Sequence, residues 1–445
     1  MTGQEILGLS MLVAMISIIF AGFPIAFTLL FIAIAFGSLG LGAETTFSLA
    51  YLQIWGLMKD DILPAVPLFI FMGFMTEQAG LIERLFLAMR NVLAPLRGSL
   101  YMAVIVTATL FAMATGIVGA AVTVLGIMAG PVMVRAGYDA KLSAGAIAAG
   151  GTLGILIPPS VMLVVMGPTI GVPVNLLYAA TLAPGLLLAT LYIVYCLGRS
   201  FLKPGLGPPV PKAERLAYGG KLAKEFLAGV VPLAVLIGFT LGTILAGVAT
   251  PTEAASCGAS GATLLALVYR RLTLKALKSA AVSTMITTSM VLFLAMASSV
   301  FGAVFTKLGA TDLITGGISQ MPFSDWGKLV LVLGLIFVLG WPFEWPAVIL
   351  VFLPIFLPVV LKLDLGLSTQ EMMIWFGALV AVNLQTAFLS PPVATSAYYL
   401  RNVMPQWSLA TIYRGMGEFM VIQIVCLGAV LLWPELALWL ARAAQ

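Results

Sequence analysis

Long hydrophobic stretches separated by short polar loops run along the whole of this chain. The apolar segments lie at residues 6–41, 62–76, 99–134, 142–198, 226–269, 279–306, 329–361, 372–400 and 415–434. A membrane-spanning helix needs about 20 apolar residues, so several segments are long enough for two passes or for a hairpin that enters and leaves on one side. The pattern predicts an all-α polytopic membrane protein with about ten to twelve spanning helices and two re-entrant hairpins.

A Pro-Pro pair interrupts an uncharged apolar stretch in each half of the chain. The first pair is Pro158 and Pro159, and the second is Pro391 and Pro392. Such a pair cannot continue an α-helix, because it removes hydrogen-bond donors and clashes with the preceding turn. Hydrocarbon does not tolerate the freed backbone groups unless protein or a polar cavity satisfies them. Broken helices at matching places in two halves therefore indicate the binding site of a transporter.

Weak internal similarity suggests that the chain consists of two related halves. The Pro-Pro pairs are 233 residues apart, and the apolar segments that precede them resemble each other at an offset of 227 residues. A basic, proline-rich stretch at 199–225 divides the chain near its midpoint, and short basic loops tend to face the cytoplasm. We therefore predict a first half at 1–198, a cytoplasmic linker at 199–225 and a second half at 226–445.

Composition and charge narrow the possible functions. Of 445 residues, 61% are hydrophobic and only 9% are charged, whereas about a quarter of a soluble domain is charged. The chain has no histidine, and its three cysteines lie far apart, which argues against a metal site, a disulfide framework or an activated nucleophile. No basic segment alternates with aromatic residues, which argues against nucleic-acid binding. No basic residue precedes Lys59, so we expect no cleavable signal and a periplasmic N-terminus.

Polar residues and glycines cluster at both breaks. The first break holds Gly151, Thr152, Ile157, Pro158, Pro159 and Ser160, and the second holds Asn383, Gln385, Thr386, Ser390, Pro391 and Pro392. A half-helix that starts at the bilayer midplane offers free N–H groups to a carboxylate, and one that ends there offers carbonyl oxygens to Na⁺. A single break is most simply a kinked structural helix, but two at related positions point to a binding surface made of neutral oxygens.

Two further segments contain candidate residues. Thr115 and Gly116 lie in an uncharged run of 36 residues, where closely spaced glycines either allow tight helix packing or let the backbone unwind at a cation site. Glu344 is the only charge in its apolar segment, which also contains Gly340 and Pro342. An ionisable residue in such a place indicates a role in transport or gating, unless it caps a half-helix or reaches the interface.

Glu253 is the only charge in the apolar segment at 226–269, but a local motif explains it. Thr250, Pro251 and Glu253 have the spacing of a capping box with proline at the first helical position. We therefore predict a structural role for these three residues.

Several stretches of the chain resemble the large membrane subunit of tripartite ATP-independent periplasmic (TRAP) transporters. These stretches are 64–73, 114–120, 150–160, 247–254 and 383–392, so the resemblance covers nearly the whole chain. It implies an elevator-type, ion-transporter-like carrier built from two inverted repeats, each with scaffold helices and one transport-domain hairpin. It also implies a multi-pass protein of the bacterial inner membrane that is driven by a Na⁺ gradient.

The resemblance further implies partners and site residues. The carrier would import an organic acid, such as a 2-oxo acid or a dicarboxylate, that a periplasmic substrate-binding protein delivers, and it would act with a separately encoded small four-helix membrane subunit. Na⁺ is the expected coupling ion, with no other metal or cofactor. By position, the Na⁺ ligands would come from Thr115, Gly116, Gly340, Pro342, Glu344, Asn383, Gln385 and Thr386, and the hairpin tips would bind substrate. Pro342 stands where many relatives have Asp, so Glu344 becomes a stronger candidate for the acidic residue of the site.

Three other functions have distinguishable signatures. A stand-alone ion-coupled organic anion carrier would need no binding protein. An intramembrane enzyme would need acid–base or metal-binding residues, yet the only adjacent acids are Asp60 and Asp61. A channel would conduct at much higher rates and would show rings of charged side chains.

Overall fold

The computed structural model describes residues 2–116, 118–210, 215, 220–391 and 394–444, with the backbone alone at residues 112, 114, 115 and 221. Over these residues the chain forms helices and connecting loops and no strands. The expected all-α membrane fold is therefore confirmed.

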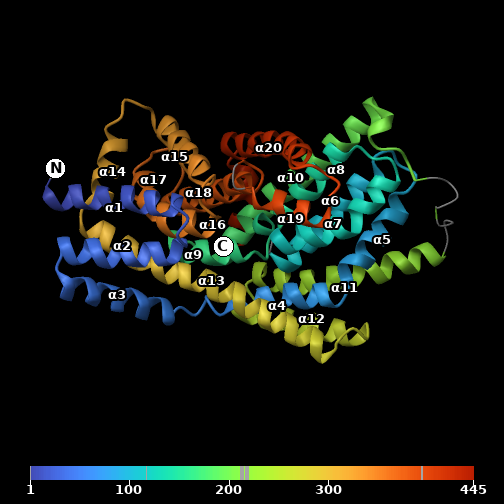
Figure 1. Ribbon diagram of the computed structural model, residues 1–445, viewed down its shortest axis with the longest axis horizontal. Helices are drawn as coiled ribbons and strands as arrows, with labels where there is room; N and C mark the ends of the chain where they lie inside the picture. Colours follow the sequence, from blue (N-terminus) through green and yellow to red (C-terminus); the bar gives the residue numbers. More distant parts are fainter. Residues whose placement is uncertain (1, 117, 211–214, 216–219, 392–393, 445) are drawn as a thin grey trace.

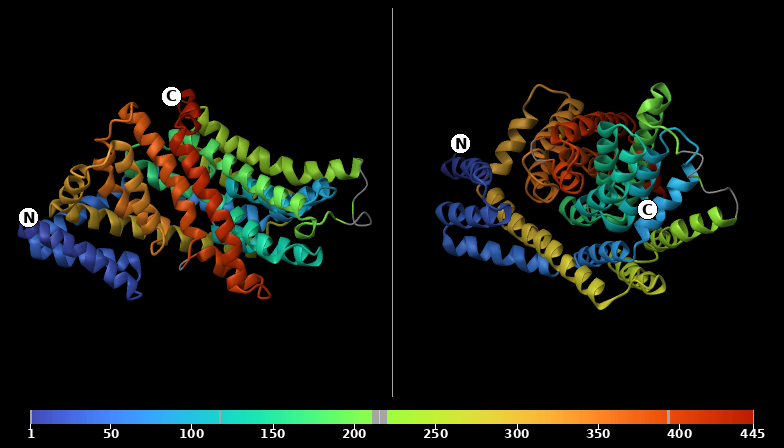
Figure 2. Two further views of the ribbon diagram at one scale, coloured as in Figure 1. Left: turned by 90° about the horizontal axis from the view of Figure 1, so that it is seen from above. Right: turned by 45° about the vertical axis from the view of Figure 1, so that its right-hand side comes forward.

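A curved outer layer of helices covers one side of the molecule (Figures 1 and 2). It consists of α1 (Gly3–Phe20), α2 (Ile25–Gly40), α3 (Ala43–Met58), α13 (Leu274–Lys307), α4 (Ala65–Gln78), α12 (Pro251–Val268), α11 (Gly220–Leu245) and α5 (Leu81–Leu93). The long α13 contacts α2, α3 and α4, and α12 joins α4 to α11. Phe27, Phe31 and Trp55 are exposed on this layer, as expected for side chains that face lipid.

The inner body contains all the breaks that the proline and glycine patterns predict. The first half contributes α6 (Ser99–Thr115), α7 (Val118–Arg135), α8 (Ala140–Leu156), α9 (Val161–Ile170), α10 (Val174–Leu202) and the short η1 (Pro204–Leu206). The second half contributes α14 (Ala310–Ser319), α15 (Asp325–Leu339), α16 (Trp345–Ala347), η3 (Val348–Phe352), α17 (Leu353–Val360), α18 (Thr369–Leu384), η4 (Gln385–Phe388), α19 (Thr395–Val403), α20 (Leu409–Leu432) and α21 (Glu435–Ala443). Helix α8 is buried from Leu142 to Leu156 and packs against α6, α7 and α20.

The two halves present their inner elements in the same order. In each, a glycine with positive φ precedes an amphipathic helix: Gly80 (φ 69°) precedes α5, and Gly309 (φ 82°) precedes α14. A broken helix follows, as α6–α7 or as α15–α16–η3–α17, and then a hairpin, as α8–α9 or α18–α19. A long helix, α10 or α20, follows each hairpin, and the second half adds the short α21. Each half contributes to both layers, so the layers do not coincide with the two halves of the chain.

Fewer helices are long enough to cross a membrane than the ten to twelve expected from the sequence. Seven described helices qualify by length and composition, or up to nine if each of two bent pairs forms one span. The difference arises because breaks divide apolar segments into shorter helices, such as the one at 345–360. Apolar length alone therefore overestimates the number of full spans in a chain with many broken helices.

Helices α8 and α20 cross at a contact made of glycines. A β-carbon at Gly415 would overlap the backbone oxygen of Lys141 and lie 2.9 Å from the backbone nitrogen of Gly145. A β-carbon at Gly145 would lie 2.6 Å from the ring of Phe419. Small residues at such a crossing allow the two backbones themselves to touch.

An ionic cluster lies at the same crossing. The Glu418 carboxylate accepts hydrogen bonds from the Lys141 ammonium (2.5 Å) and the Tyr195 hydroxyl (2.6 Å), and it lies 3.5 Å from the Arg199 guanidinium. These four residues join α8, α10 and α20. Helix α8, the first arm of the first hairpin, is thus held to α10 and α20 by charge as well as by packing.

The start of α12 has a capping box at the predicted residues. Thr250 Oγ1 accepts a hydrogen bond from the Glu253 backbone N–H (3.2 Å), and Glu253 Oε2 accepts one from the Thr250 N–H (2.8 Å). Pro251 is the first residue of the helix, where its missing N–H costs nothing.

Replacing Thr250 with alanine should lower the free energy of unfolding by about 1 kcal/mol, because the N-cap hydroxyl satisfies an otherwise free N–H group. Chemical unfolding of the purified protein in detergent measures this. Thr263→Ala is the matched control: Thr263 donates to the Ala259 carbonyl from the interior of the same helix (2.8 Å), so its loss should not lower stability. Equal losses in the two variants would contradict a capping role.

Candidate functional site

The first hairpin breaks at the Pro158–Pro159 pair. Helix α8 ends at Leu156 and α9 begins at Val161, and the two helices are bent by 43°. The nearby hydroxyls are used locally: Thr152 Oγ1 donates to the Ala149 carbonyl (2.8 Å). Ser160 Oγ donates in the same way to the Ile155 carbonyl (2.6 Å).

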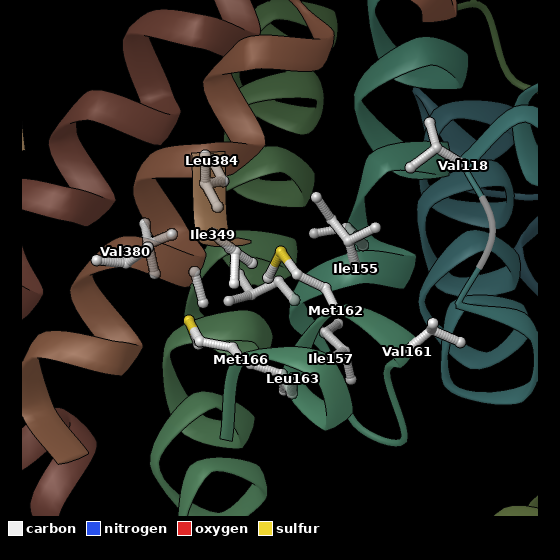
Figure 3. Packing of buried hydrophobic residues seen from close by; sticks show 14 of the residues in the cluster. Val118, Ile155, Ile157, Val161, Met162, Leu163, Met166, Ile349, Val380 and Leu384 are labelled. Carbon is white, nitrogen blue, oxygen red and sulfur yellow. The ribbon is translucent and has the colours of Figure 1, made fainter. Parts of the chain in front are cut away.

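The tip of this hairpin packs into the apolar core. Figure 3 shows Met162 of the hairpin beside Ile349 of η3, with Ile157 below Met162. Ile157 is fully buried, and a β-carbon at Gly185 of α10 would lie 2.5 Å from its side chain. The side chain of Ile157, which is predicted at a substrate-binding tip, packs against α10 in this structure.

The second hairpin breaks after Leu384, where η4 follows α18 and α19 begins only at Thr395. Pro391 is exposed, whereas Pro392 lies outside the described residues. Asn383 Nδ2 donates to the Leu333 carbonyl (2.8 Å), which fastens this hairpin to α15.

Buried polar atoms without partners gather at the second break, whereas the Thr152 and Ser160 hydroxyls at the first break are bonded. Asn383, Gln385, Thr386 and Ser390 are all at most 1% exposed. Thr386 Oγ1 donates to the Asn383 carbonyl (2.7 Å), but Asn383 Oδ1, Gln385 Oε1 and Nε2, and Ser390 Oγ find no hydrogen-bond partner among the described residues. A buried polar atom left without a partner costs about 1–3 kcal/mol, so such a cluster requires an explanation. Neutral oxygens of this kind fit a hard cation such as Na⁺.

The two broken helices pack against the hairpins of their own halves. Gly116 has φ +61°, and a β-carbon there would lie 3.3 Å from the Val161 nitrogen of the first hairpin. A β-carbon at Gly340 would lie 3.1 Å from the Ala387 side chain of the second hairpin. The Thr115 side chain lies outside the described residues, and Pro342 lies between α15 and α16. The two halves are also in direct contact here, because α19 packs on α7, where a β-carbon at Gly126 would lie 2.6 Å from the Val403 side chain.

A cavity of about 200 Å³ lies where the four breaks meet. The broken helices contribute Gly116, Val118, Gly119, Glu344, Trp345 and Pro346, and the hairpins contribute Ile155, Val161, Phe388, Thr395 and Tyr399. The outer layer closes the cavity with Ile70 of α4 and with Thr287, Met290 and Val291 of α13. The site therefore lies between the outer layer and the inner body.

Helices of both halves begin at this cavity. Val118, Val161 and Thr395 are the first residues of α7, α9 and α19, and all three line it. Helices α9 and α19 have no side-chain cap, whereas the other arms of the hairpins are capped by Asp139 and Ser368. Uncapped N–H groups and the positive end of the helix dipole suit an anionic group, so the cavity can bind a carboxylate without a basic residue.

Glu344 is the only charged side chain among the described lining residues. It is exposed where it lines the cavity, and it makes no ion pair or hydrogen bond with any residue that the structure describes. It occupies the N-cap position of α16, yet its carboxylate does not bond to the start of that helix. Local helix capping therefore does not explain this carboxylate.

Of the residues singled out from the sequence, Gly116 and Glu344 line the cavity. Gly151, Thr152, Pro158, Pro159 and Ser160 are buried within the first hairpin, and Gly151 gives Val122 of α7 room to approach. Sequence reasoning missed the lining residues Thr395 and Tyr399, although both follow closely after the second Pro-Pro pair. It also missed Thr287, because α13 is an unbroken helix without any local signal.

A family model described as "Tripartite ATP-independent periplasmic transporter, DctM component" matches residues 12–436. The sialic acid TRAP transporter large permease protein SiaM of Vibrio cholerae is 29% identical over 434 residues, covering 96% of each chain. The C4-dicarboxylate TRAP transporter large permease protein DctM of Pseudomonas aeruginosa is 29% identical over 376 residues, covering 84% of each chain.

Among solved structures, the YdaH transporter of Alcanivorax borkumensis has a similar fold, with a TM-score of 0.63 and 16% sequence identity. The match covers 88% of this chain and 89% of that one. At this identity the likeness concerns the fold alone, and it agrees with a polytopic membrane architecture.

Proposed function

Because the chain belongs to the DctM component family of tripartite ATP-independent periplasmic transporters, we propose that it couples the import of an organic acid to a Na⁺ gradient. The chain is a multi-pass permease of the inner membrane and not an enzyme. It carries out secondary transport together with a periplasmic binding protein and a small membrane subunit. The coupling ion, the substrate class and the four-helix form of the small subunit belong to the proposal.

The helix N-termini at the cavity, of which those of α9 and α19 have no side-chain cap, carry the proposal for an organic acid. Helices α7, α9 and α19 all begin there, and the described lining residues include no Lys or Arg that could serve instead. A carboxylate in such a site would accept hydrogen bonds from backbone N–H groups at the positive ends of helices. Two relatives are named for sialic acid and for C4-dicarboxylates, which supports an acid as the substrate here.

Buried oxygens at the second hairpin support Na⁺ as the coupling ion. Asn383 Oδ1, Gln385 Oε1 and Ser390 Oγ are available there, and Thr386 lies in the same stretch. A cation at this place would satisfy atoms that are otherwise costly to bury. Gly116 and Gly340 would supply backbone carbonyl oxygens at the two broken helices, as half-helix ends do in other carriers.

The location of the cavity supports an elevator-type movement. Helices α4 and α13 of the outer layer close one side of it, and both hairpins of the inner body form the other. We infer that the outer layer acts as the scaffold and that the inner body carries solute and cation past it. The ionic cluster around Glu418 would hold α8, α10 and α20 together during that movement.

Uptake by reconstituted protein tests the coupling. The chain is placed in proteoliposomes with its small membrane subunit, and the binding protein, loaded with whichever of radiolabelled sialic acid, succinate or glycine betaine it binds, is added outside. We expect uptake under an inward Na⁺ gradient to fall to background when K⁺ replaces Na⁺, because the buried oxygens would then lack their cation.

Equal uptake with K⁺ would contradict Na⁺ coupling. Uptake that persists without the binding protein would instead indicate a stand-alone organic anion carrier. Collapse of the Na⁺ gradient with an ionophore at constant Na⁺ concentration is the control, and it should stop accumulation without preventing binding.

A further inference from the structure

We propose that the cavity selects a solute that carries a positively charged nitrogen in addition to a carboxylate, and that Glu344 binds this nitrogen. The inference rests on the proposed function, since it names the class of organic acid. Solutes with two carboxylates and no positive charge would be poor substrates.

The charge balance of the cavity is the first argument. Glu344 faces the cavity without a partner, and the described lining residues provide no basic side chain to neutralise it. Like charges repel, so a purely anionic solute beside this uncompensated carboxylate would be disfavoured. A positive group on the solute removes the repulsion and gives Glu344 a partner.

The aromatic lining favours an organic cation over a metal ion. Trp345, Phe388 and Tyr399 line the same cavity as Glu344. The faces of aromatic rings attract ammonium and quaternary ammonium groups. Na⁺ requires several oxygen ligands, and the lining side chains other than Glu344 offer only the hydroxyls of Tyr399, Thr287 and Thr395.

The rest of the cavity suits a negatively charged group of the solute. The uncapped N-termini of α9 and α19 reach it at Val161 and Thr395, and they can receive a carboxylate. The cavity thus offers one negative side chain and two positive helix ends. A dipolar solute satisfies both, whereas a dicarboxylate satisfies only the helix ends.

Thermal unfolding of the purified chain with its small membrane subunit, in nanodiscs at constant Na⁺ concentration, tests this. The probes are glycine betaine, with one carboxylate and one quaternary nitrogen, and succinate, with two carboxylates. We expect betaine to raise the melting temperature and succinate to have little effect. In Glu344→Gln the concentration of betaine needed for half of the shift should rise at least tenfold, while succinate should become a better ligand.

Two control variants distinguish loss of the Glu344 charge from a general change in the stability of the fold. Glu344→Asp keeps the charge and should retain a preference for betaine. Glu44→Gln neutralises an exposed carboxylate at the first turn of α3, away from the cavity, and should behave like the wild type. If betaine fails to stabilise the wild type, if succinate stabilises it equally, or if Glu344→Gln keeps the preference, the proposal is wrong.

This experiment separates the inference from the proposed function. It uses no ion gradient and a fixed Na⁺ concentration, so a failure of Na⁺ coupling in the uptake assay would leave the betaine preference unchanged. Conversely, Na⁺-driven uptake of a dicarboxylate at full rate would support the proposed function and overturn this inference.

Discussion

Replacing Gly415 with alanine should lower the free energy of unfolding by about 3 kcal/mol, with little folded protein recovered at growth temperature. The added β-carbon would overlap the Lys141 backbone oxygen, and it would lie 2.9 Å from the Gly145 nitrogen. Both obstacles are backbone atoms, so no change of side-chain rotamer can relieve the clash. Helices α8 and α20 would have to separate, which would also stretch the hydrogen bond from Lys141 to Glu418. Thermal unfolding and size-exclusion chromatography in detergent measure the effect.

Gly417 provides the matched control for this prediction. It lies two residues away on the same helix, and a β-carbon there would have no atom within 4 Å. Alanine favours a helix over glycine by about 1 kcal/mol, so Gly417→Ala should leave stability unchanged or raise it. If both variants unfold alike, the close approach of α8 and α20 is not what stabilises this part of the fold.

Replacing Gln385 with methionine should change stability in opposite directions with and without Na⁺. Without Na⁺ the variant should be more stable by about 1–3 kcal/mol, because two buried polar atoms without partners are removed at similar volume. With Na⁺ it should lose the cation's contribution, which is about 2.7 kcal/mol for a site at a hundred times its dissociation constant. Unfolding measured over a Na⁺ titration, with K⁺ or choline holding the ionic strength, gives both values.

Gln423 makes this test specific to the second hairpin. It is also a fully buried glutamine, but it lies on α20 rather than at a break. Gln423→Met should therefore keep the full Na⁺ effect. A Na⁺ effect that survives in Gln385→Met, or that disappears in both variants, would remove Gln385 from the cation site.

The breaks in the helices were predictable because their causes are local. Proline pairs and a glycine such as Gly116 leave a signature within a few residues, and the capping box at Thr250 and Glu253 is equally local. The use of each polar group at a break was not predictable. Thr152 and Asn383 look like equivalent oxygen donors in the sequence, yet Thr152 bonds to its own helix while Asn383 Oδ1 has no described partner.

The cavity itself depends on contacts between distant parts of the chain. Residues Ile70, Thr287 and Tyr399 come from three helices, and none of these residues stands out in the sequence. Two isolated glutamates in apolar segments likewise have different surroundings: Glu253 caps its own helix, whereas Glu344 faces the cavity. The sequence motif explains the first, and only the tertiary structure identifies the second.

Each broken helix packs on the hairpin of its own half, at Gly116 with Val161 and at Gly340 with Ala387, but the cavity is shared by both halves. A solute in the cavity would therefore touch the broken elements of both halves, and its binding free energy would depend on how both are arranged. If the ion and the solute favour the same arrangement, thermodynamic reciprocity requires each to raise the affinity for the other by the same factor. Cooperativity between cargo and ion then follows from the shared cavity, without direct contact between them.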